Sequence, residues 1–315
     1  MALRITNSIV AQRTLADLQR SYAAMARTQE QIASGYRVNR PSDDPLAAGM
    51  ARLRQNELDQ LQSAKRGVES ATAWLSASET ALSSISSILA RARELVVQGA
   101  NDTMSPANRI AIADEIDALI ESAKDALNVK VGDRYIFAGT ATTTPPYSDG
   151  TGDAYQGNDG AVVREIGPGV TVQVNPQIVP LGGGGPTPLT ADAVLGSGGG
   201  DGRVLDVLRN ISQHLRNGTP ADIEALRTTD LAALEENTKA IANARAAVGT
   251  VQNRVDAAAD RIAQLQEVAS QAYGDLVGTD LIQALTDIRL QEAAYQSALS
   301  SSARIIQPSL MDFLR

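Results

Sequence analysis

The 315-residue chain contains no cysteine and only one histidine, His214. The absence of cysteine excludes disulfides, zinc–thiolate sites and cysteine nucleophiles. A Ser–His–Asp arrangement would have to use His214, which the sequence places on an exposed helix, and the His-Glu-x-x-His motif of metalloproteases does not occur. We therefore expect a protein that is not an enzyme and that holds no cofactor or metal ion.

Aromatic residues are also scarce, at 3% of the chain, although 43% of all residues are hydrophobic. Ala, Leu, Ile and Val suit narrow seams between helices better than a thick globular core. The net charge of −8, from 28 basic and 36 acidic residues, argues against a nucleic-acid-binding surface. No apolar run of about 18 residues predicts membrane insertion, and "MALRITNSIVAQRTL" lacks the apolar segment of a secretory signal peptide.

Apolar residues instead recur at alternating intervals of three and four, the spacing of a coiled-coil seam. Such seams occupy residues 15–36, 61–96, 241–276 and 281–306. The second seam belongs to a predicted helix of about 55 residues that starts at Pro45 and extends on the order of 80 Å. A shorter apolar stripe, from Ile112 to Ala126, follows Ser105 and Pro106, which are typical of a helix start. The two long seams predict antiparallel pairing.

Residues 139–201 have a different pattern. The run "AVVREIGPGVTVQV" predicts a β-hairpin with Val170, Val172 and Val174 on one face. Glycine-rich stretches after it predict loops. A helix returns near Arg203 and ends before Gly218, and Thr219 and Pro220 start the next one. We expect this β-rich unit to form the turnaround at the far tip of the paired helices.

The expected fold class is mainly α: a long antiparallel coiled-coil hairpin formed by the N- and C-terminal segments, with a small β-rich domain inserted in the middle. Polar residues interrupt both terminal seams, so we expect the terminal helices to be mobile in a monomer and ordered when packed with copies of themselves. The expected inner coiled-coil domain comprises an N-terminal helix at 1–44 and a C-terminal helix at 277–315. The expected rod-like core comprises residues 45–138 and 202–276, and the outer β-rich domain comprises residues 139–201.

The stretch "NRPSDDPLAAGM", residues 39–50, places two aspartates beside a serine. A catalytic or metal site would need a pocket there. The end of one helix and the start of another need no pocket. Pro41 disfavours helix at Arg40, and Asp44 can cap a helix that has Pro45 at its first position. Negative charge is favourable at the N-terminus of a helix. We favour an inter-domain joint that fixes an angle between helices, formed by Pro41, Ser42, Asp43, Asp44 and Pro45.

The same stretch closely resembles the segment between terminal and core helices in flagellin-like axial proteins of bacteria. Its "PSDDP" is similar to the version in the hook-associated protein 3 family rather than in flagellin. The run "GDRYIFAGTATTTPPYS" (132–148) resembles the family's transition to its outer domain, and "LQEAAYQSALSSSARIIQPSLMDFLR" resembles its amphipathic tail. The opening "RITNS" and "QIASGYR" also fit, whereas the middle of the chain matches nothing specific.

The resemblance implies a structural role at the hook–filament junction of the bacterial flagellum, outside the cell. It implies a homo-oligomeric ring seated on hook-associated protein 1, a surface on which flagellin polymerises, a cytosolic export chaperone, and secretion by the flagellar type III export apparatus without a cleaved signal. In this role the apolar stripes at both ends would form the assembly interface: Leu15, Leu18, Tyr22, Met25, Ile32, Leu285, Ile288, Tyr295, Leu299, Ile306 and Phe313. For each residue, ordinary packing within one chain is the competing interpretation.

Two other functions remain open at this stage. The chain could be a flagellin, the subunit of the filament itself, from which "PSDDP" and "RYIFAGT" chiefly separate it. It could also be a carbohydrate-active or adhesive enzyme whose working part is residues 140–200.

Overall fold

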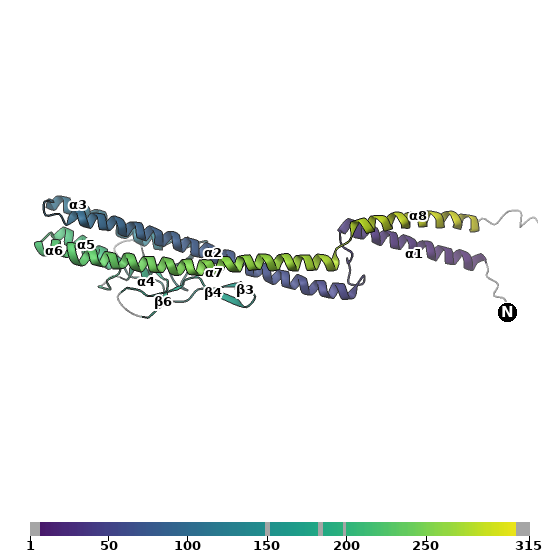
Figure 1. Cartoon of the computed structure of the whole chain (residues 1–315), viewed down its shortest axis with the longest axis horizontal. Coiled ribbons are helices and arrows are strands. Elements are labelled where there is room, and N and C mark those ends of the chain that lie inside the picture. Colours follow the sequence, from purple (N-terminus) through teal and green to yellow (C-terminus); the bar gives the residue numbers. More distant parts are fainter. Residues whose placement is uncertain (1–6, 149–151, 182–184, 198–199, 307–315) are drawn as a thin grey trace, which may run out of the picture. The chain divides into compact units, whose positions relative to one another are not determined.

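The structure, a computed structural model, describes residues 7–148, 152–181, 185–197 and 200–306 (Figure 1). Its residues form two compact units. Unit 1 combines the two end segments of the chain, up to Asp59 and from Gln266, and unit 2 comprises Gln60–Leu265. The helices α2 (Pro45–Gly99) and α7 (Leu231–Val277) contribute residues to both units.

In unit 1, α1 (Asn7–Ser34) packs against α8 (Leu281–Ile306). The α1 helix ends at Ser34 because Gly35 adopts the left-handed conformation, with a φ of 74°, that glycine tolerates best. Tyr36, expected in the first seam, therefore lies outside the helix, and that part of the prediction is wrong. The α2 helix starts at Pro45 and has 55 residues, as expected.

Unit 2 contains the predicted helix starts and stops. Ser105 accepts a hydrogen bond from the Asn108 N–H at the start of α3 (Pro106–Leu127). The α5 helix (Val204–Asn217) ends at Gly218, which has a φ of 61°, and Thr219 forms a capping box with Asp222 at the start of α6 (Pro220–Ala225). A π-helical turn, η1 (Leu226–Asp230), joins α6 to α7; the sequence pattern did not predict it.

The core of unit 2 lies along the predicted seams. Every residue of the seam from Leu61 to Val96 is buried, including the polar Ser78. The seam of α7 is buried from Ile241 to Ile262 apart from a half-buried alanine, whereas Leu265 is exposed. The two helices run antiparallel. Arg227 of η1, just before α7, binds the carbonyl of Ala100, just after α2, and an ion pair joins Glu79 to Arg245 at 2.6 Å. The coiled-coil hairpin is confirmed within this unit.

The helices α3 and α5 pack against each other and complete the core (Figure 1). Their inner faces carry Ile112, Ile116 and Ile120 on α3 and Leu208 and Ile211 on α5, all buried. At the surface, Arg216 of α5 reaches Asp114 at 2.7 Å and Asp117 at 2.6 Å.

The strands form three separate two-stranded antiparallel sheets. The predicted hairpin is present as β3 and β4, with Arg164 paired to Val172. Val172 and Val174 are buried, whereas Val170 is exposed because it lies at the turn. The strand bounds are β1 (Lys130–Val131), β2 (Arg134–Tyr135), β3 (Val163–Gly167), β4 (Val170–Gln173), β5 (Gln177–Ile178) and β6 (Thr187–Pro188), followed by the short helix α4 (Ala191–Leu195).

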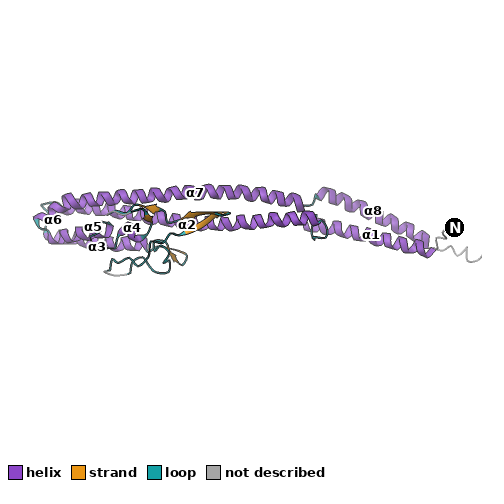
Figure 2. Cartoon of the chain, turned by 90° about the horizontal axis from the view of Figure 1, so that it is seen from below, coloured by secondary structure: helices purple, strands orange, loops and turns teal. Residues whose placement is uncertain are grey.

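The expectation that the β-rich unit forms the far tip is wrong. The tip consists of the turn between α2 and α3, where the Arg227 guanidinium donates to the Ala100 carbonyl at 2.7 Å. The strands lie beside the middle of the helices (Figure 2), because α3 leads the chain back along the core before β1 begins. Arg164 of β3 lies over the Trp74 ring at 5.5 Å. A Cβ at Gly67 would collide with the Glu165 carbonyl oxygen, so glycine permits this close approach of hairpin and helix.

A buried ion network holds the inserted region on the helices. Asp153 lies 2.8 Å from the Lys124 Nζ and accepts two hydrogen bonds from Arg209, while the Lys124 side chain is only 3% exposed. Burial alone would raise the pKa of Asp153. The hydrogen bonds from Arg209 and Lys124 outweigh it and hold that pKa below the usual value.

Replacing Asp153 with Ala should lower the free energy of unfolding by about 2–4 kcal/mol at pH 7, because it leaves the Lys124 ammonium buried without its main partner. The lowered pKa means that the contribution is present above the ordinary aspartate pKa of about 3.9 and is lost as pH falls through the lower, folded-state value. Chemical denaturation at pH 7 and pH 3 measures both effects, with the exposed Asp159→Ala as the matched control. Equal stability of Asp153→Ala and the natural protein at pH 7 would contradict the role of the network.

Candidate functional site

The linker between α1 and α2 is fastened to the linker between α7 and α8. The Arg37 N–H donates to the Val277 carbonyl at 2.7 Å, and the Thr279 N–H donates to the Gly35 carbonyl at 3.0 Å. The Arg37 guanidinium also reaches the Leu276 carbonyl at 3.1 Å. These bonds join parts of unit 1 that are far apart in the sequence, so the two linkers behave as one joint.

The two aspartates of the joint act as helix and turn caps. The Asp44 carboxylate accepts from the Ala47 N–H at 3.0 Å and from Arg37 at 3.2 Å. The Ala47 N–H, followed by Arg37, lowers the pKa of Asp44 from its ordinary value. Asp43 instead accepts a hydrogen bond from the Arg40 N–H at 2.8 Å, which closes the turn of residues 40–43 that contains Pro41. This geometry supports structural roles for both carboxylates, although the part of Pro41–Pro45 in fixing an angle stays a prediction.

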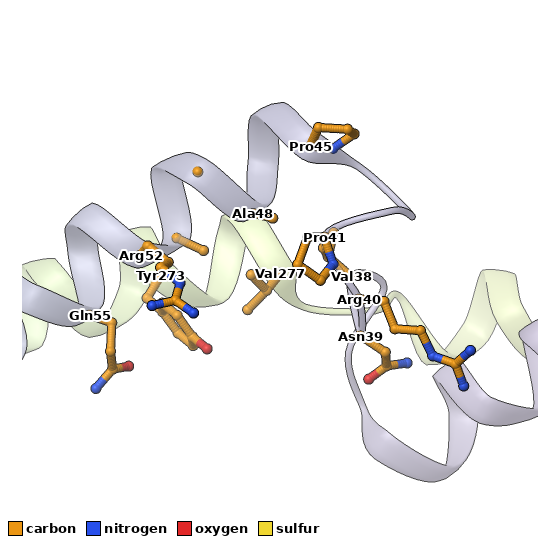
Figure 3. A pocket seen from close by; sticks show the side chains of 12 residues that line it. Val38, Asn39, Arg40, Pro41, Pro45, Ala48, Arg52, Gln55, Tyr273 and Val277 are labelled. Carbon is orange, nitrogen blue, oxygen red and sulfur yellow. The ribbon is translucent and has the colours of Figure 1, made fainter.

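A groove lies beside the joint, within unit 1 (Figure 3). Its volume is about 440 Å³, and small or apolar residues of α2 form much of its wall. Figure 3 shows Arg52, Gln55 and Tyr273 towards one end and Asn39 and Arg40 towards the other. The lining residues are Val38, Asn39, Arg40, Pro41, Pro45, Ala48, Gly49, Ala51, Arg52, Gln55, Tyr273 and Val277.

The helices α1 and α8 form a thin pair. Among the described side chains of α1 and α8, only Thr28, Ala284 and Ser302 are buried, and none of these is large and apolar. Tyr22 and Tyr295 meet across the pair with ring centroids 6.2 Å apart. A pair of this kind closes no apolar core of its own.

The proposed interface residues fall into two groups in this pair. The half-buried ones lie towards the partner helix: Leu18, Met25, Ile32, Ile288 and Tyr295. The exposed ones are Leu15, Tyr22, Leu285 and Leu299. Ile306 is the last residue of α8, and Phe313 lies outside the described residues. The exposed group keeps its assembly role as a proposal, whereas the first group also has intramolecular packing to explain it.

The structure exposes further apolar side chains that sequence reasoning missed. Leu46, Met50 and Leu53 follow one another at intervals of four and three on the first turns of α2, and Leu46 and Leu53 are 70% and 69% exposed. The sequence shows this spacing, but these residues lie before the α2 seam that the pattern predicts from Leu61 onward. Most of the exposed large apolar residues described thus belong to unit 1, the smaller unit.

The expectation that His214 is solvated on an exposed helix is wrong. Its side chain is 28% exposed, and its Nδ1 lies 2.7 Å from the carboxylate of Asp230, which is 6% exposed. Burial raises the pKa of Asp230, and the hydrogen bond to His214 opposes this rise. The pair connects α5 to η1 within unit 2. Packing against η1 therefore covers the side of α5 that carries His214, which the sequence alone does not predict.

Among the residues that the structure describes, no group of three or more His, Asp or Glu side chains could hold a metal ion. Within the same residues, no helix is both long and apolar enough to cross a membrane.

Comparison with known proteins gives matches at both ends of the chain. A model of the bacterial flagellin N-terminal helical region matches residues 5–142, and one of the C-terminal helical region matches residues 231–314. Flagellar hook-associated protein 3 of Escherichia coli is 26% identical over 307 residues, 94% of this chain and 95% of that protein. Flagellin of Bacillus subtilis is 26% identical over 310 residues, 97% of each chain. The crystal structure of Bacillus cereus FlgL shares the fold, with a TM-score of 0.56 and 21% identity, over 70% of this chain and 99% of that one.

Replacing Asp44 with Ala should loosen the joint, because the Ala47 N–H loses its acceptor and Arg37 loses its ion pair. We expect faster amide exchange in the first turn of α2 and faster protease cleavage within residues 36–44, with Asp44→Asn intermediate because Asn can still cap a helix. Since the pKa of Asp44 is lowered, the difference should be present above the ordinary aspartate pKa and fade as pH falls through the folded-state value. Asp17→Ala, which removes an exposed aspartate of α1 outside the joint, is the control. An Asp44→Ala protein with natural exchange and cleavage rates would refute the capping role.

Proposed function

The chain belongs to the flagellin family of axial proteins, and within that family we propose that it is a structural subunit of the hook–filament junction of the bacterial flagellum. The observation that carries the proposal is the near full-length similarity to flagellar hook-associated protein 3 of Escherichia coli, together with the "PSDDP" joint. A junction subunit must bind copies of itself and two different neighbours. It needs exposed apolar surface more than it needs a reactive pocket.

Unit 1 supplies that surface. Its two terminal helices bury no large apolar side chain completely among those described, and Leu15, Tyr22, Leu285 and Leu299 remain exposed. Large exposed apolar patches on a folded chain are typical of an interaction site, and these side chains lie along one helix pair. We assign these residues to contacts between copies in a ring, in which neighbouring copies complete the helix pair that one chain leaves open.

Unit 2 serves in the proposal as the stable body that carries these helices. Its core is continuous from Ala64 to Ile262 and holds the inserted β strands in place. The proposed partners are hook-associated protein 1 on the hook side and flagellin on the filament side. A cytosolic export chaperone and the flagellar type III export apparatus would precede assembly, and the final location would be the outside of the cell.

The second candidate function is that of flagellin, the subunit of the filament. It is favoured by the similarity to flagellin of Bacillus subtilis over 97% of each chain. The two functions differ in polymerisation. A filament subunit extends long filaments when purified and seeded, whereas a junction subunit caps hook ends and supports growth of flagellin without forming long filaments alone.

A strain that lacks this chain should make hooks of normal length and shed flagellin into the medium, and the natural protein should restore filaments. The variant Leu285→Asp/Leu299→Asp should be produced, and its free energy of unfolding should lie within about 0.5 kcal/mol of the natural protein's, because both side chains are already exposed. It should nevertheless fail to restore filaments, since the carboxylates would be buried against a neighbour without partners.

Val179→Asp, an equally drastic change at an exposed residue of the inserted region, should complement and serves as the control. Normal filaments in the deletion strain would refute the junction role. Long filaments grown from the purified chain would favour the flagellin alternative, and full complementation by the double variant would remove Leu285 and Leu299 from the interface.

A further inference from the structure

The first turns of α2 carry an apolar ridge. Leu46, Met50 and Leu53 are all exposed, and with 3.6 residues per turn they lie on one side of the helix. Glu57, one turn further along the same side, continues the ridge with a negative charge. Glu57 pairs with Arg54 at 2.7 Å, and this exposed surface pair can exchange for another partner.

The opposite side of the same helix segment borders the groove. Ala48, Arg52 and Gln55 line it, and by the same geometry they lie roughly opposite the ridge. Gly49 also lines the groove, and a Cβ there would meet no atom within 4 Å. Tyr273 and Val277 of α7 form the other wall (Figure 3). Ridge and groove both belong to unit 1, so one rigid helix presents them on two flanks.

The charges of the two flanks are complementary. Arg52 has no ion-pair partner among the residues that the structure describes, and it borders the groove. Arg40, at the other end, pairs with Glu30 at 3.2 Å while its side chain stays largely exposed. The groove therefore has arginines at its ends and mostly small or apolar walls. Such a groove can accommodate an apolar ridge that ends in a carboxylate, and the chain itself has a ridge of this kind.

We propose that neighbouring copies bind head to tail at this helix, with the ridge of Leu46, Met50 and Leu53 from one copy seated in the groove beside Gly49 of the next, and with Glu57 meeting Arg52. Different patches on the two flanks make a heterologous contact, which closes into a ring when the rotation between copies permits. The inference rests on the proposed junction role, because it names the contact that links copies around the ring.

The absence of cysteine from the chain allows a direct test by cross-linking. Met50→Cys places a thiol on the ridge and Ala48→Cys places one in the groove. Isolated hook–filament structures from strains carrying these variants are treated with a short bismaleimide, whose reach tolerates an offset of about one helical turn, roughly 5 Å. The double variant should give a ladder of covalent oligomers of this chain, and a mixture of the two single variants should give dimers only.

Each alternative outcome has a separate meaning. Dimers from Met50→Cys alone would show that ridge meets ridge, which overturns the head-to-tail contact. Absence of a ladder in structures that contain the double variant would also overturn it, while leaving the junction role intact. Absence of the chain from hook–filament structures would refute the junction role and this contact together.

A groove-filling variant gives a second, independent measurement. Gly49→Leu should leave the melting temperature unchanged or raise it, because leucine favours helix over glycine and the site is open. The same change should reduce the cross-linked ladder at least about tenfold by occupying the groove. Gly249→Leu, at another helical glycine with open surroundings, is the control and should keep the ladder. A full ladder from Gly49→Leu would exclude the groove as the binding site.

Discussion

The architecture depends on one unmet requirement: among the described residues, the helices α1 and α8 have apolar stripes but too little partner surface to bury them. In unit 2, α2 and α7 share a core with two further helices and a set of strands, and the seam residues from Leu61 to Val96 are buried. In unit 1, α1 packs mainly against α8 among the described residues, and leucines of both helices remain exposed. Fully burying an exposed leucine is worth roughly 1.5–3 kcal/mol. Covering the part of these side chains that remains exposed would therefore be favourable.

Polar interactions position these helices rather than stabilise a core. Arg37 illustrates this: its backbone and guanidinium bind carbonyls at the end of α7, and it also pairs with the cap of α2. One residue therefore connects both linkers of unit 1. The neighbouring groove is lined by residues of the same linkers, so the residues that form the joint also shape this groove.

Much of the fold followed from local patterns. The 55-residue helix, the caps at Ser105 and Thr219 and the hairpin around Gly167 could be predicted because each depends on residues close together in the sequence. The position of the β strands, the pairing of His214 with Asp230 and the exposure of Leu265 could not, because each depends on which distant segment packs there. The assembly stripes were predicted from spacing alone, which does not distinguish a seam to a partner helix from a seam to another copy; exposure separates Leu285 and Leu299 from Met25 and Ile32. The ridge of Leu46, Met50 and Leu53 lies in a segment whose sequence pattern predicts only a helix start.

The most direct measurement is amide hydrogen exchange of the same chain as a verified monomer and in isolated hook–filament structures. If copies complete the terminal helices, the amides of α1 and α8 should exchange at least about a hundredfold faster than those of the α2 core in the monomer and should become protected after assembly. Equal protection of α1, α8 and the α2 core in the monomer would contradict the account.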